Sequence, residues 1–484
     1  MPKNNVISFG DCFQLPNQGL RTYFGNVVKG QNSIYDTPFA KGESTSELLA
    51  EWDKTLVSIR DKWPTLYDFE VDLGKKVGPM SVMKPLKERM DDIESYYEGI
   101  LLPSKPVLNS AVAAVKKEWS KLAGLQVRKQ ARTVELMKKS TNSGSPYFRK
   151  RRLVVTDTVP CSTYILGGHD FQKLRSGEFG AAAVLGWRGQ ESGPKPSDVK
   201  QRVVWMFPFA VNIRELQVYQ PLIESAQKFN LVPAWVSMDA VDERITKMFD
   251  TKNESDLVVC TDFSKFDQHF NHSLQSVAYQ LLAALFTPNE EMVSWLRDVF
   301  PIKYQIPIAY DYGKLKFGNH GMGSGSGGTN ADETLAHRAL QYEAAQINSA
   351  TLNPNSQCLG DDGILTYPGI TVEDVVKAYT SHGLEMNESK QYASTHDCTY
   401  LRRWHHKDYR ENGICVGVYS TNRALGRLRY LERYYDPEVW GPKMVALRQL
   451  SIIENVKYHP LRDQFAEFCM KRDKYRLGID IPGF

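Results

Sequence analysis

The chain has 484 residues, a formal net charge of +4 and 42% hydrophobic residues, enough to bury the core of two or three domains or of one large enzyme. No apolar run reaches the roughly 20 residues of a membrane span, and the N-terminal stretch lacks the apolar segment of a secretory signal. Seven cysteines without a Cys-x-x-Cys pair argue against a disulfide framework and against a zinc site. We therefore expect a soluble intracellular protein with reduced thiols.

The first hundred residues show no strong periodicity and predict only an extension or outer layer. A helical, basic pattern runs from Val107 to Lys139, and a loop rich in Asn, Ser and Gly follows at 141–152. Between Lys116 and Arg152 there are twelve Lys or Arg and two Glu, a local net charge of +10. This basic stretch is either a solvated helix face or a phosphate-binding surface.

The middle of the chain begins with strand signals. A loop at 188–200 precedes the apolar run 203–205, which is typical of a strand. The sequence DLVVCTDF at 256–263 predicts a buried strand that presents Asp262 at its tip. Apolar residues at helical spacing then predict a helix over 274–285 that packs against this strand.

Two further helices and a hairpin follow. A glycine-rich loop at 318–330 opens a helix over 331–346, and CLGDDGILTY at 358–367 has the Asp-Gly pattern of a hairpin turn. Thr371 predicts the start of an amphipathic helix that ends near Gly383. From residue 256 the order is strand, helix, glycine loop, helix, hairpin, helix, strand, which indicates an α+β sheet with helices on one face. The last sixty residues predict helices rich in Arg and Tyr.

The adjacent carboxylates of Asp361 and Asp362 repel each other. The pair either shapes the turn alone or faces a divalent cation that offsets the repulsion. If the two strands are neighbours, Asp262 lies beside this pair. Aspartates without His or Cys suit Mg²⁺ or Mn²⁺, and two such ions about 3.5–4 Å apart serve in-line phosphoryl displacement.

The glycine loop does not match a nucleoside-triphosphatase P-loop, because Thr329 and Asn330 follow its last glycine without the required lysine. Asn330 with Glu333 satisfies the signature of a helix capping box, which is compatible with a ligand role. Asp267 is compatible with an ordinary surface position at a helix start.

Three segments together resemble the central palm motifs of viral RNA-dependent RNA polymerases: DFSKFD at 262–267, SGSGGTN at 324–330 and GDD at 360–362. Their particular forms are most similar to those of picobirnaviruses, with partitiviruses next. Many positive-strand RNA virus polymerases carry an asparagine four residues after the motif threonine, where this chain has Glu333. The sequence therefore leaves Asn330 and Glu333 as alternative partners of Asp267.

Four flanking segments extend the resemblance. SGSP at 143–146 is similar to the family's template-entry motif, and KQRVVW at 200–205 is similar to its fingers motif. ESKQY at 388–392 lies where the family carries its palm lysine, and TYLRRWHH at 399–406 lies where its primer-grip hairpin would be.

The resemblance implies an α+β fold shaped as a right hand, with fingers, palm and thumb and an antiparallel palm sheet backed by helices. The implied domains are an N-terminal extension or fingertips at 1–100, fingers at 101–255, a palm at 256–410 with a fingers insertion at about 287–318, and a thumb at 411–484. The implied activity is template-directed RNA synthesis, by two-metal nucleotidyl transfer from nucleoside triphosphates to an RNA 3′-hydroxyl, which replicates and transcribes a viral RNA genome.

The resemblance also implies roles for individual residues. The implied metal-binding and catalytic residues are Asp262, Asp361 and Asp362, with Asp362 as a weaker or outer ligand and Lys390 as the general acid for pyrophosphate. The implied nucleotide-binding residues are Lys200, Arg202, Asp267, Ser324, Thr329 and Asn330. The implied template-binding residues are Ser143, Gly144, Ser145 and Pro146, with the basic stretch lining the template channel. Without the motifs, Arg202 would be an ordinary strand-end charge and Lys390 a solvated lysine.

The implied cofactors are two Mg²⁺ or Mn²⁺ ions. The implied partners are RNA template and product, nucleoside triphosphates and viral capsid protein, with no membrane, for a monomer in the virion interior and host cytoplasm. Two rival functions remain at this point. A reverse transcriptase would place a bulky side chain, not Asp267, against the sugar, and a non-catalytic RNA-binding protein would incorporate no nucleotides.

Overall fold

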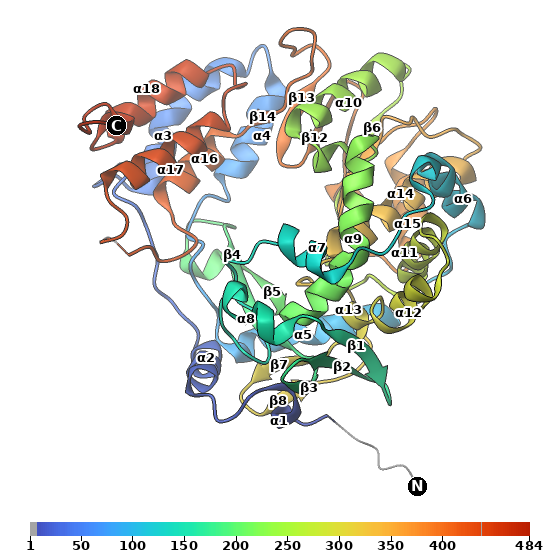
Figure 1. The fold of residues 1–484 in the computed structure, drawn as a ribbon. Coiled ribbons are helices and arrows are strands. Elements are labelled where there is room, and N and C mark those ends of the chain that lie inside the picture. Colours follow the sequence, from blue (N-terminus) through green and yellow to red (C-terminus); the bar gives the residue numbers. More distant parts are fainter. Residues whose placement is uncertain (1–6, 437) are drawn as a thin grey trace. The chain divides into compact units, whose positions relative to one another are not determined.

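The computed structural model describes residues 7–436 and 438–484 and consists of two compact units (Figure 1). The first unit combines the chain up to Val28 with Leu86–Gly186 and Val203–His396. The second combines Lys29–Pro85, Trp187–Arg202 and Asp397–Phe484. Each unit therefore joins segments that are distant in the sequence. The domain boundaries expected from the family resemblance stay predictions.

The first unit contains most of the helices and strands. Its helices are α1 Phe9–Cys12, α2 Gln18–Lys29, α5 Leu86–Glu98, α6 Asn109–Glu118, α7 Gln130–Leu136, α8 Arg151–Thr158, α9 Phe209–Lys228, α10 Met238–Thr251, α11 His272–Leu285, α12 Glu290–Asp298, α13 Ile302–Gln305, α14 Thr329–Ile347 and α15 Val372–Thr380. Its strands are β1 Ser162–Leu166, β2 His169–Leu174, β3 Gly177–Gly180, β6 Val258–Thr261, β7 Ile308–Asp311, β8 Lys314–Lys316, β9 Gln357–Leu359, β10 Asp362–Leu365 and β11 Tyr392–Ser394.

A four-stranded antiparallel sheet in the order β11-β6-β10-β9 lies at the centre of this unit. Strand β6 is buried along its whole length, as its apolar sequence predicts. Buried residues of α11, α14 and α15 join Val259 of β6 and Leu365 of β10 in one apolar core. The α+β sheet with covering helices is therefore confirmed.

The predicted elements around this sheet occur with one local correction. Between α11 and the glycine loop, the described chain also forms α12, α13, β7 and β8. Strands β7 and β8 belong to a different sheet, in the order β5-β4-β7-β8, where β4 is Ala183–Gln190 and β5 is Lys200–Met206. The simple order expected from residue 256 was therefore incomplete, because short strands at 308–316 carry too few residues for a clear period.

Two helix predictions were less accurate. The basic stretch does not form one continuous helix, since α6 ends at Glu118 and α7 begins only at Gln130. The first hundred residues, for which no element was predicted, form α1, α2 and α5 in the first unit and further helices in the second. By contrast, the side chain of Thr371 caps α15 by accepting a hydrogen bond from the Asp374 amide at 3.1 Å, as predicted.

The second unit is mainly helical. Its helices are α3 Thr45–Leu56, α4 Pro64–Gly74, α16 Thr421–Arg429, α17 Pro442–Glu454 and α18 Arg462–Arg472, and its hairpin sheet has the order β12-β13-β14, with β12 Asp397–Tyr400, β13 Arg403–His406 and β14 Val418–Tyr419. Trp52 of α3 and Phe465 of α18 contact each other within a shared apolar core. The C-terminal helices predicted from the sequence are confirmed, and they pack on helices from the first hundred residues.

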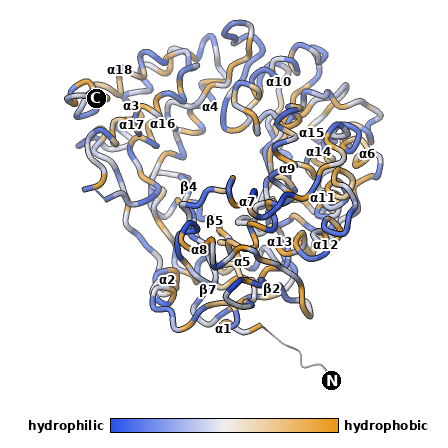
Figure 2. The backbone as a smooth tube through the Cα atoms, viewed as in Figure 1, coloured by the Kyte–Doolittle hydropathy of each residue, from blue (hydrophilic) through white to orange (hydrophobic). Residues whose placement is uncertain are grey.

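Hydrophobic and hydrophilic residues are interspersed along the helices, as the colouring in Figure 2 shows. This pattern is typical of helices that bury one face and expose the other. Over the described ranges, none of the helices has the length and apolar character required to cross a bilayer.

Candidate active site

The register of the central sheet brings the predicted aspartates together. Thr261 of β6 lies opposite Gly363 of β10 in the antiparallel pair. Asp262 directly follows Thr261, and Asp361 and Asp362 directly precede Gly363. The three carboxylates therefore belong to the same end of two paired strands. Asp262 and Asp361 are exposed there, and Asp362 is half-buried.

Gln391, which the sequence analysis did not single out, fixes the backbone at Asp262. Its Oε1 accepts a hydrogen bond from the Asp262 amide at 2.7 Å, and its Nε2 donates to the Asp262 carbonyl at 2.9 Å. Gln391 directly follows Lys390, which is exposed at the end of a 3₁₀ turn, Glu388–Lys390. The two-point amide contact therefore also brings the backbone of Lys390 close to the aspartate strand.

The aspartate hairpin turns through Gly360 and Asp361, the two residues between β9 and β10. Gly360 has φ of +58°, a conformation that glycine adopts at little cost. The hairpin lies against α14 through Thr334 and His337, two residues that the sequence analysis did not single out. Thr334 Oγ1 accepts a hydrogen bond from the Gly360 amide at 2.9 Å, and His337 Nδ1 donates to the Gly360 carbonyl at 2.8 Å.

Close packing explains why the second glycine of the hairpin, Gly363, has no side chain. A Cβ at Gly363 would lie 2.6 Å from Cε1 of His337, so the imidazole and the strand fit only without a side chain there. Burial lowers the pKa of His337 to about 4, which keeps the ring neutral near neutral pH. His337 is therefore a neutral donor beneath the hairpin.

Two more polar side chains of α14 bind the same hairpin. Gln341 Nε2 donates to the carbonyls of Gln357 and Ile364, at 2.9 and 3.3 Å. Arg338 donates to the Ser356 carbonyl at 2.6 Å. With Thr334 and His337, these residues form a polar stripe at helical spacing on an otherwise Ala- and Leu-rich helix. That stripe is the sequence signal that could have identified them.

The capping box predicted at Asn330 and Glu333 is wrong. Helix α14 begins at Thr329, and its N-cap is Gly328, which has no side chain to cap the helix. Glu333 is buried and shares a side-chain hydrogen bond with Asp267. Asn330 is exposed, and its Oδ1 accepts a hydrogen bond from Trp235 Nε1 at 2.7 Å. A tertiary partner has replaced the local cap.

The glycine loop before α14 is held from several sides. Ser324 Oγ accepts a hydrogen bond from the Trp205 amide at 3.3 Å. The buried carboxylate of Glu215 on α9 accepts hydrogen bonds from Ser326 Oγ and from the Gly327 amide. Thr329 Oγ1 donates to the Gly323 carbonyl at 3.3 Å. Ser324 and Thr329, both predicted as nucleotide-binding residues, thus also shape the loop.

A buried ion pair lies beneath the start of α14. Lys303 of α13 and Asp332 are both fully buried, with Nζ and Oδ2 3.0 Å apart. The hydroxyls of Tyr219 and Tyr304 donate to Asp332 at 2.7 and 2.6 Å. Burial lowers the pKa of Lys303, and Asp332 and Glu215 oppose that effect. A buried pair with further hydrogen bonds positions a helix but adds little net stability.

Other predicted residues lie elsewhere in the chain. Lys200 and Arg202 belong to the part of β5 in the second unit, where Arg202 Nε donates to Gln190 Oε1 at 3.0 Å. The predicted template residues at 143–146 are buried. Ser143 Oγ accepts from the Arg149 amide at 3.1 Å, and Ser145 Oγ donates to the Cys12 carbonyl. The roles of these residues in binding stay predictions.

The basic stretch contains both exposed and engaged side chains. Most of its Lys and Arg residues are exposed. Three are half-buried with partners: Arg128 pairs with Glu224, Arg151 NH2 donates to Asn212 at 2.9 Å, and Lys139 donates to backbone carbonyls. The exposed members are compatible with both expectations for this segment, a solvated face and a phosphate-binding surface.

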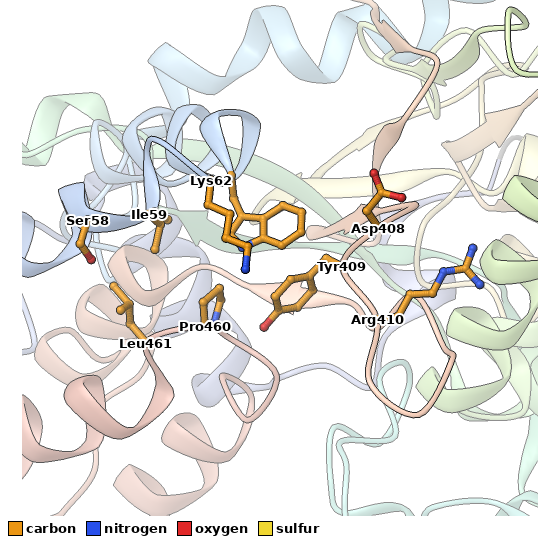
Figure 3. Close-up of a pocket in the computed structure, with 9 residues that line it drawn as sticks. Ser58, Ile59, Lys62, Asp408, Tyr409, Arg410, Pro460 and Leu461 are labelled. Carbon is orange, nitrogen blue, oxygen red and sulfur yellow. The ribbon is translucent and has the colours of Figure 1, made fainter.

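A pocket of about 470 Å³ lies in the second unit, and none of its lining residues is a predicted site residue (Figure 3). It is lined by Ser58, Ile59, Lys62, Trp63, Asp408, Tyr409, Arg410, Pro460 and Leu461. Trp63 and Tyr409 meet edge to face, with ring centroids 5.1 Å apart. Both rings line this pocket.

The aspartate end of the sheet has the donor chemistry for a hard cation but no preformed cage. Within residues 7–436 and 438–484, no group of three His, Cys, Asp or Glu side chains converges to hold a metal ion. Mg²⁺ ordinarily combines one or two carboxylates with water and substrate phosphates, so Asp262 and Asp361 fit it in that way.

Comparison with known proteins agrees with these motifs. The model of the family described as viral RNA-dependent RNA polymerase matches residues 36–464. A "Potential RNA-dependent RNA polymerase" of human picobirnavirus is 66% identical over 472 residues, 98% of this chain and 88% of that protein.

Two solved structures show the same fold. The crystal structure of the RNA-dependent RNA polymerase of a human picobirnavirus has a TM-score of 0.97 at 65% identity, covering 98% of this chain and 91% of that chain. The structure of its insertion loop deletion mutant has a TM-score of 0.96 at 65% identity, covering 98% and 94%. The α+β polymerase fold is thereby confirmed, and the chain belongs to the viral RNA-dependent RNA polymerases.

Proposed function

We propose that this RNA-dependent RNA polymerase transfers nucleotides from nucleoside triphosphates to an RNA 3′-hydroxyl by a two-metal mechanism, replicating and transcribing a viral RNA genome. The observation that carries the proposal is the register of Thr261 opposite Gly363. It assigns Asp262 and the Asp361–Asp362 pair to one end of the sheet. Like charges so arranged are useful when cations neutralise them.

Asp262 and Asp361 are the proposed ligands of two Mg²⁺ or Mn²⁺ ions, with Asp362 as the weaker or outer ligand. The exposure of Asp262 and Asp361 supports the assignment, because a metal with bound phosphates needs open carboxylates. When bound, paired ions stabilise charge on the attacking and leaving oxygens of an in-line displacement. Gln391 and α14 keep the strand and the hairpin in place for this purpose.

Lys390 is the proposed general acid for the leaving pyrophosphate. Its exposed position beside Gln391, which binds the backbone of Asp262, supports this role. A lysine near a polyphosphate both neutralises charge and delivers a proton from its ammonium group.

The sugar-binding residues in the proposal are Asp267, Ser324, Thr329 and Asn330. Polar groups at this position support ribonucleotide use, because the 2′-hydroxyl needs hydrogen-bond partners. A reverse transcriptase would require a bulky side chain there, and Asp267 hydrogen-bonded to Glu333 does not provide one.

RNA template and product and nucleoside triphosphates are the proposed ligands, with the exposed Lys and Arg of the basic stretch contacting template phosphates irrespective of sequence. A capsid protein partner, a monomeric state, and a place in the virion interior and host cytoplasm complete the proposal. These last features rest on the family resemblance alone.

The test is incorporation of labelled ribonucleotides and deoxyribonucleotides on a single-stranded RNA template, with and without Mg²⁺ and with a chelator. Template-dependent, Mg²⁺-dependent ribonucleotide incorporation is expected. Preferred incorporation of deoxyribonucleotides would support the reverse transcriptase alternative. Absence of any incorporation by folded protein that binds RNA would support a non-catalytic RNA-binding function.

A further inference from the structure

The pocket of the second unit joins three segments that are distant in the sequence: the stretch 58–63 after α3, the loop residues 408–410 and the turn at 460–461 before α18 (Figure 3). Its volume of about 470 Å³ falls in the range of roughly 300–1,000 Å³ that is ordinary for small-ligand sites. None of its lining residues has a role in the proposed reaction. The pocket is therefore a candidate for a second binding site.

The aromatic wall of the pocket is held by contacts within the same unit. Trp63 and Tyr409 are half-buried and meet edge to face, with ring centroids 5.1 Å apart. The Tyr409 hydroxyl donates a hydrogen bond to the Tyr458 carbonyl at 2.5 Å, and the Trp63 ring also meets that of His406, with centroids 5.1 Å apart. A wall that is fixed before binding loses little conformational entropy when a ligand arrives.

Positive charge lies next to this aromatic wall. Lys62 and Arg410 are exposed cations and Asp408 is the acidic residue of the lining, so the lining carries a net charge of +1. Lys62 Nζ is 5.7 Å from the centroid of the Trp63 ring. In Figure 3 the Lys62 ammonium is directed toward the side of Tyr409, and the Asp408 carboxylate points away from it. Such a lining favours an anionic ligand over a cationic one.

Aromatic rings beside cations suit a nucleotide. A base of any identity stacks on aromatic side chains, and Lys or Arg contacts its phosphate. Single-stranded RNA presents unpaired bases to such a wall, whereas the bases of a duplex stay stacked inside the helix. A proline-rich protein segment would also pack on aromatic rings, but it gains nothing from the adjacent cations. The charge of the pocket therefore favours RNA.

We propose that this pocket binds one nucleotide of a single-stranded RNA, with the base against Trp63 and Tyr409 and a neighbouring phosphate at Lys62 and Arg410. The candidate catalytic aspartates belong to the first unit, so the pocket is a separate site. It holds a segment of RNA and performs no chemistry on it. Its occupation therefore does not depend on nucleotidyl transfer.

The experiment locates bound RNA on the full chain by photo-crosslinking with a short single-stranded oligoribonucleotide that contains thiouridine. The measured quantity is the yield of crosslinks in segments 58–63 and 408–410, mapped by mass spectrometry. Tyr409→Leu removes the ring, whereas Tyr409→Phe keeps the ring and loses only the hydroxyl bond to Tyr458. Lys62→Glu reverses the charge beside the wall. Its matched control is Lys41→Glu, an exposed lysine of the same unit outside the pocket.

We expect crosslinks in these segments of the parent, and competition by unlabelled single-stranded RNA. Lys62→Glu and Tyr409→Leu should lower the yield there by roughly fivefold or more, because a phosphate contact or a stacking surface is lost. Tyr409→Phe and Lys41→Glu should keep the yield within about twofold of the parent. Thermal melting establishes folding, and the exposed Lys62 gives a variant that does not disturb the core should Tyr409→Leu not fold.

Three outcomes would overturn the proposal. The first is a folded parent without crosslinks in this pocket, which would favour a protein segment as its occupant. The second is an unchanged yield in folded Lys62→Glu. The third is competition by a free nucleoside triphosphate but not by unlabelled RNA. The Asp361→Asn variant, in which nucleotide incorporation should be abolished, should crosslink as the parent does, so a failure of the proposed function is distinguishable from a failure of this inference.

Discussion

His337 Nδ1 donates a hydrogen bond to the carbonyl of Gly360, 2.8 Å away, and so joins the helix after the glycine loop to the turn that carries Asp361. A carbonyl can only accept, so the proton is on Nδ1. The other nitrogen, Nε2, is buried and has no hydrogen-bond partner among the described residues. The ring therefore acts through one contact and through its close fit to Gly363.

Replacing His337 tests whether this contact positions the aspartates. His337→Ala is expected to lower kcat tenfold or more with little change in KM for the nucleotide, because the hairpin loses its support while the substrate contacts stay. Lost packing and the lost hydrogen bond should also destabilise the fold by roughly 2–4 kcal/mol. Single-nucleotide incorporation kinetics and thermal melting measure both effects.

The matched control is His272→Ala, an exposed histidine at the start of α11, which should change neither quantity. His337→Gln offers a donor of similar reach and should recover part of the lost kcat. Unchanged kcat in a folded His337→Ala protein would show that the Gly360 turn holds its geometry without the imidazole.

The aspartates themselves are expected to differ in importance. Asp262→Asn and Asp361→Asn should abolish nucleotide incorporation, because a neutral amide is a poor ligand for a hard cation. Asp362→Asn, at the half-buried position, should retain measurable activity. The measurement is primer or product extension at saturating Mg²⁺, with the exposed Asp239→Asn of α10 as a control for a lost surface charge. Appreciable activity of folded Asp361→Asn would contradict the two-metal assignment.

The site divides into parts that the sequence predicts and parts that it does not. The strand before Asp262 and the hairpin around Asp361 follow from short apolar runs and turn residues, which act locally. The contacts of Gln391 and His337 do not, because each joins a side chain to backbone groups far away in the sequence. Such contacts depend on the tertiary fold, and residue type alone does not indicate the partner.

The error at Asn330 has the same physical origin. A capping box is a local rule worth about 1 kcal/mol, and it assumes that both side chains are available to the helix end. Here Glu333 binds Asp267 and Asn330 binds Trp235, while Gly328 begins the helix. Competing tertiary partners therefore overrode a correct local pattern. In the same loop, Gly325 is constrained by a contact with the backbone of Trp205.

Gly325→Ala is expected to disrupt the glycine loop, because a Cβ at this position would overlap the carbonyl oxygen of Trp205. Backbone atoms cannot move aside as a flexible side chain can, so we expect destabilisation of about 3 kcal/mol and a large loss of activity. The control is Gly25→Ala in α2, where an added Cβ meets no atom within 4 Å. Urea unfolding midpoints and incorporation rates would test the pair. Equal behaviour of the two variants would show that the loop adapts to a side chain at 325.

The buried carboxyl of Asp170 predicts a pH dependence of the stability of the fold. It lies in β2, is 1% exposed, and its Oδ1 lacks a hydrogen-bond partner among the described residues. Burial raises the pKa of its carboxyl to about 8, against about 3.9 in an unfolded chain. The folded protein thus keeps a proton on Asp170 that the unfolded chain has already released.

This difference in bound protons determines whether the stability of the fold rises or falls with pH. Below about pH 4 both states are protonated, and the contribution of Asp170 to stability is fully present. Between about pH 4 and 8 the folded state binds the extra proton, so stability falls as pH rises, by roughly 1.4 kcal/mol per pH unit from this group. Asp170→Asn, with a neutral side chain of the same shape, should lack this slope. The denaturation midpoint of the Asn variant, relative to that of the parent, should therefore increase across measurements at pH 5, 6, 7 and 8. A constant difference between the midpoints of the two proteins would show that Asp170 titrates normally.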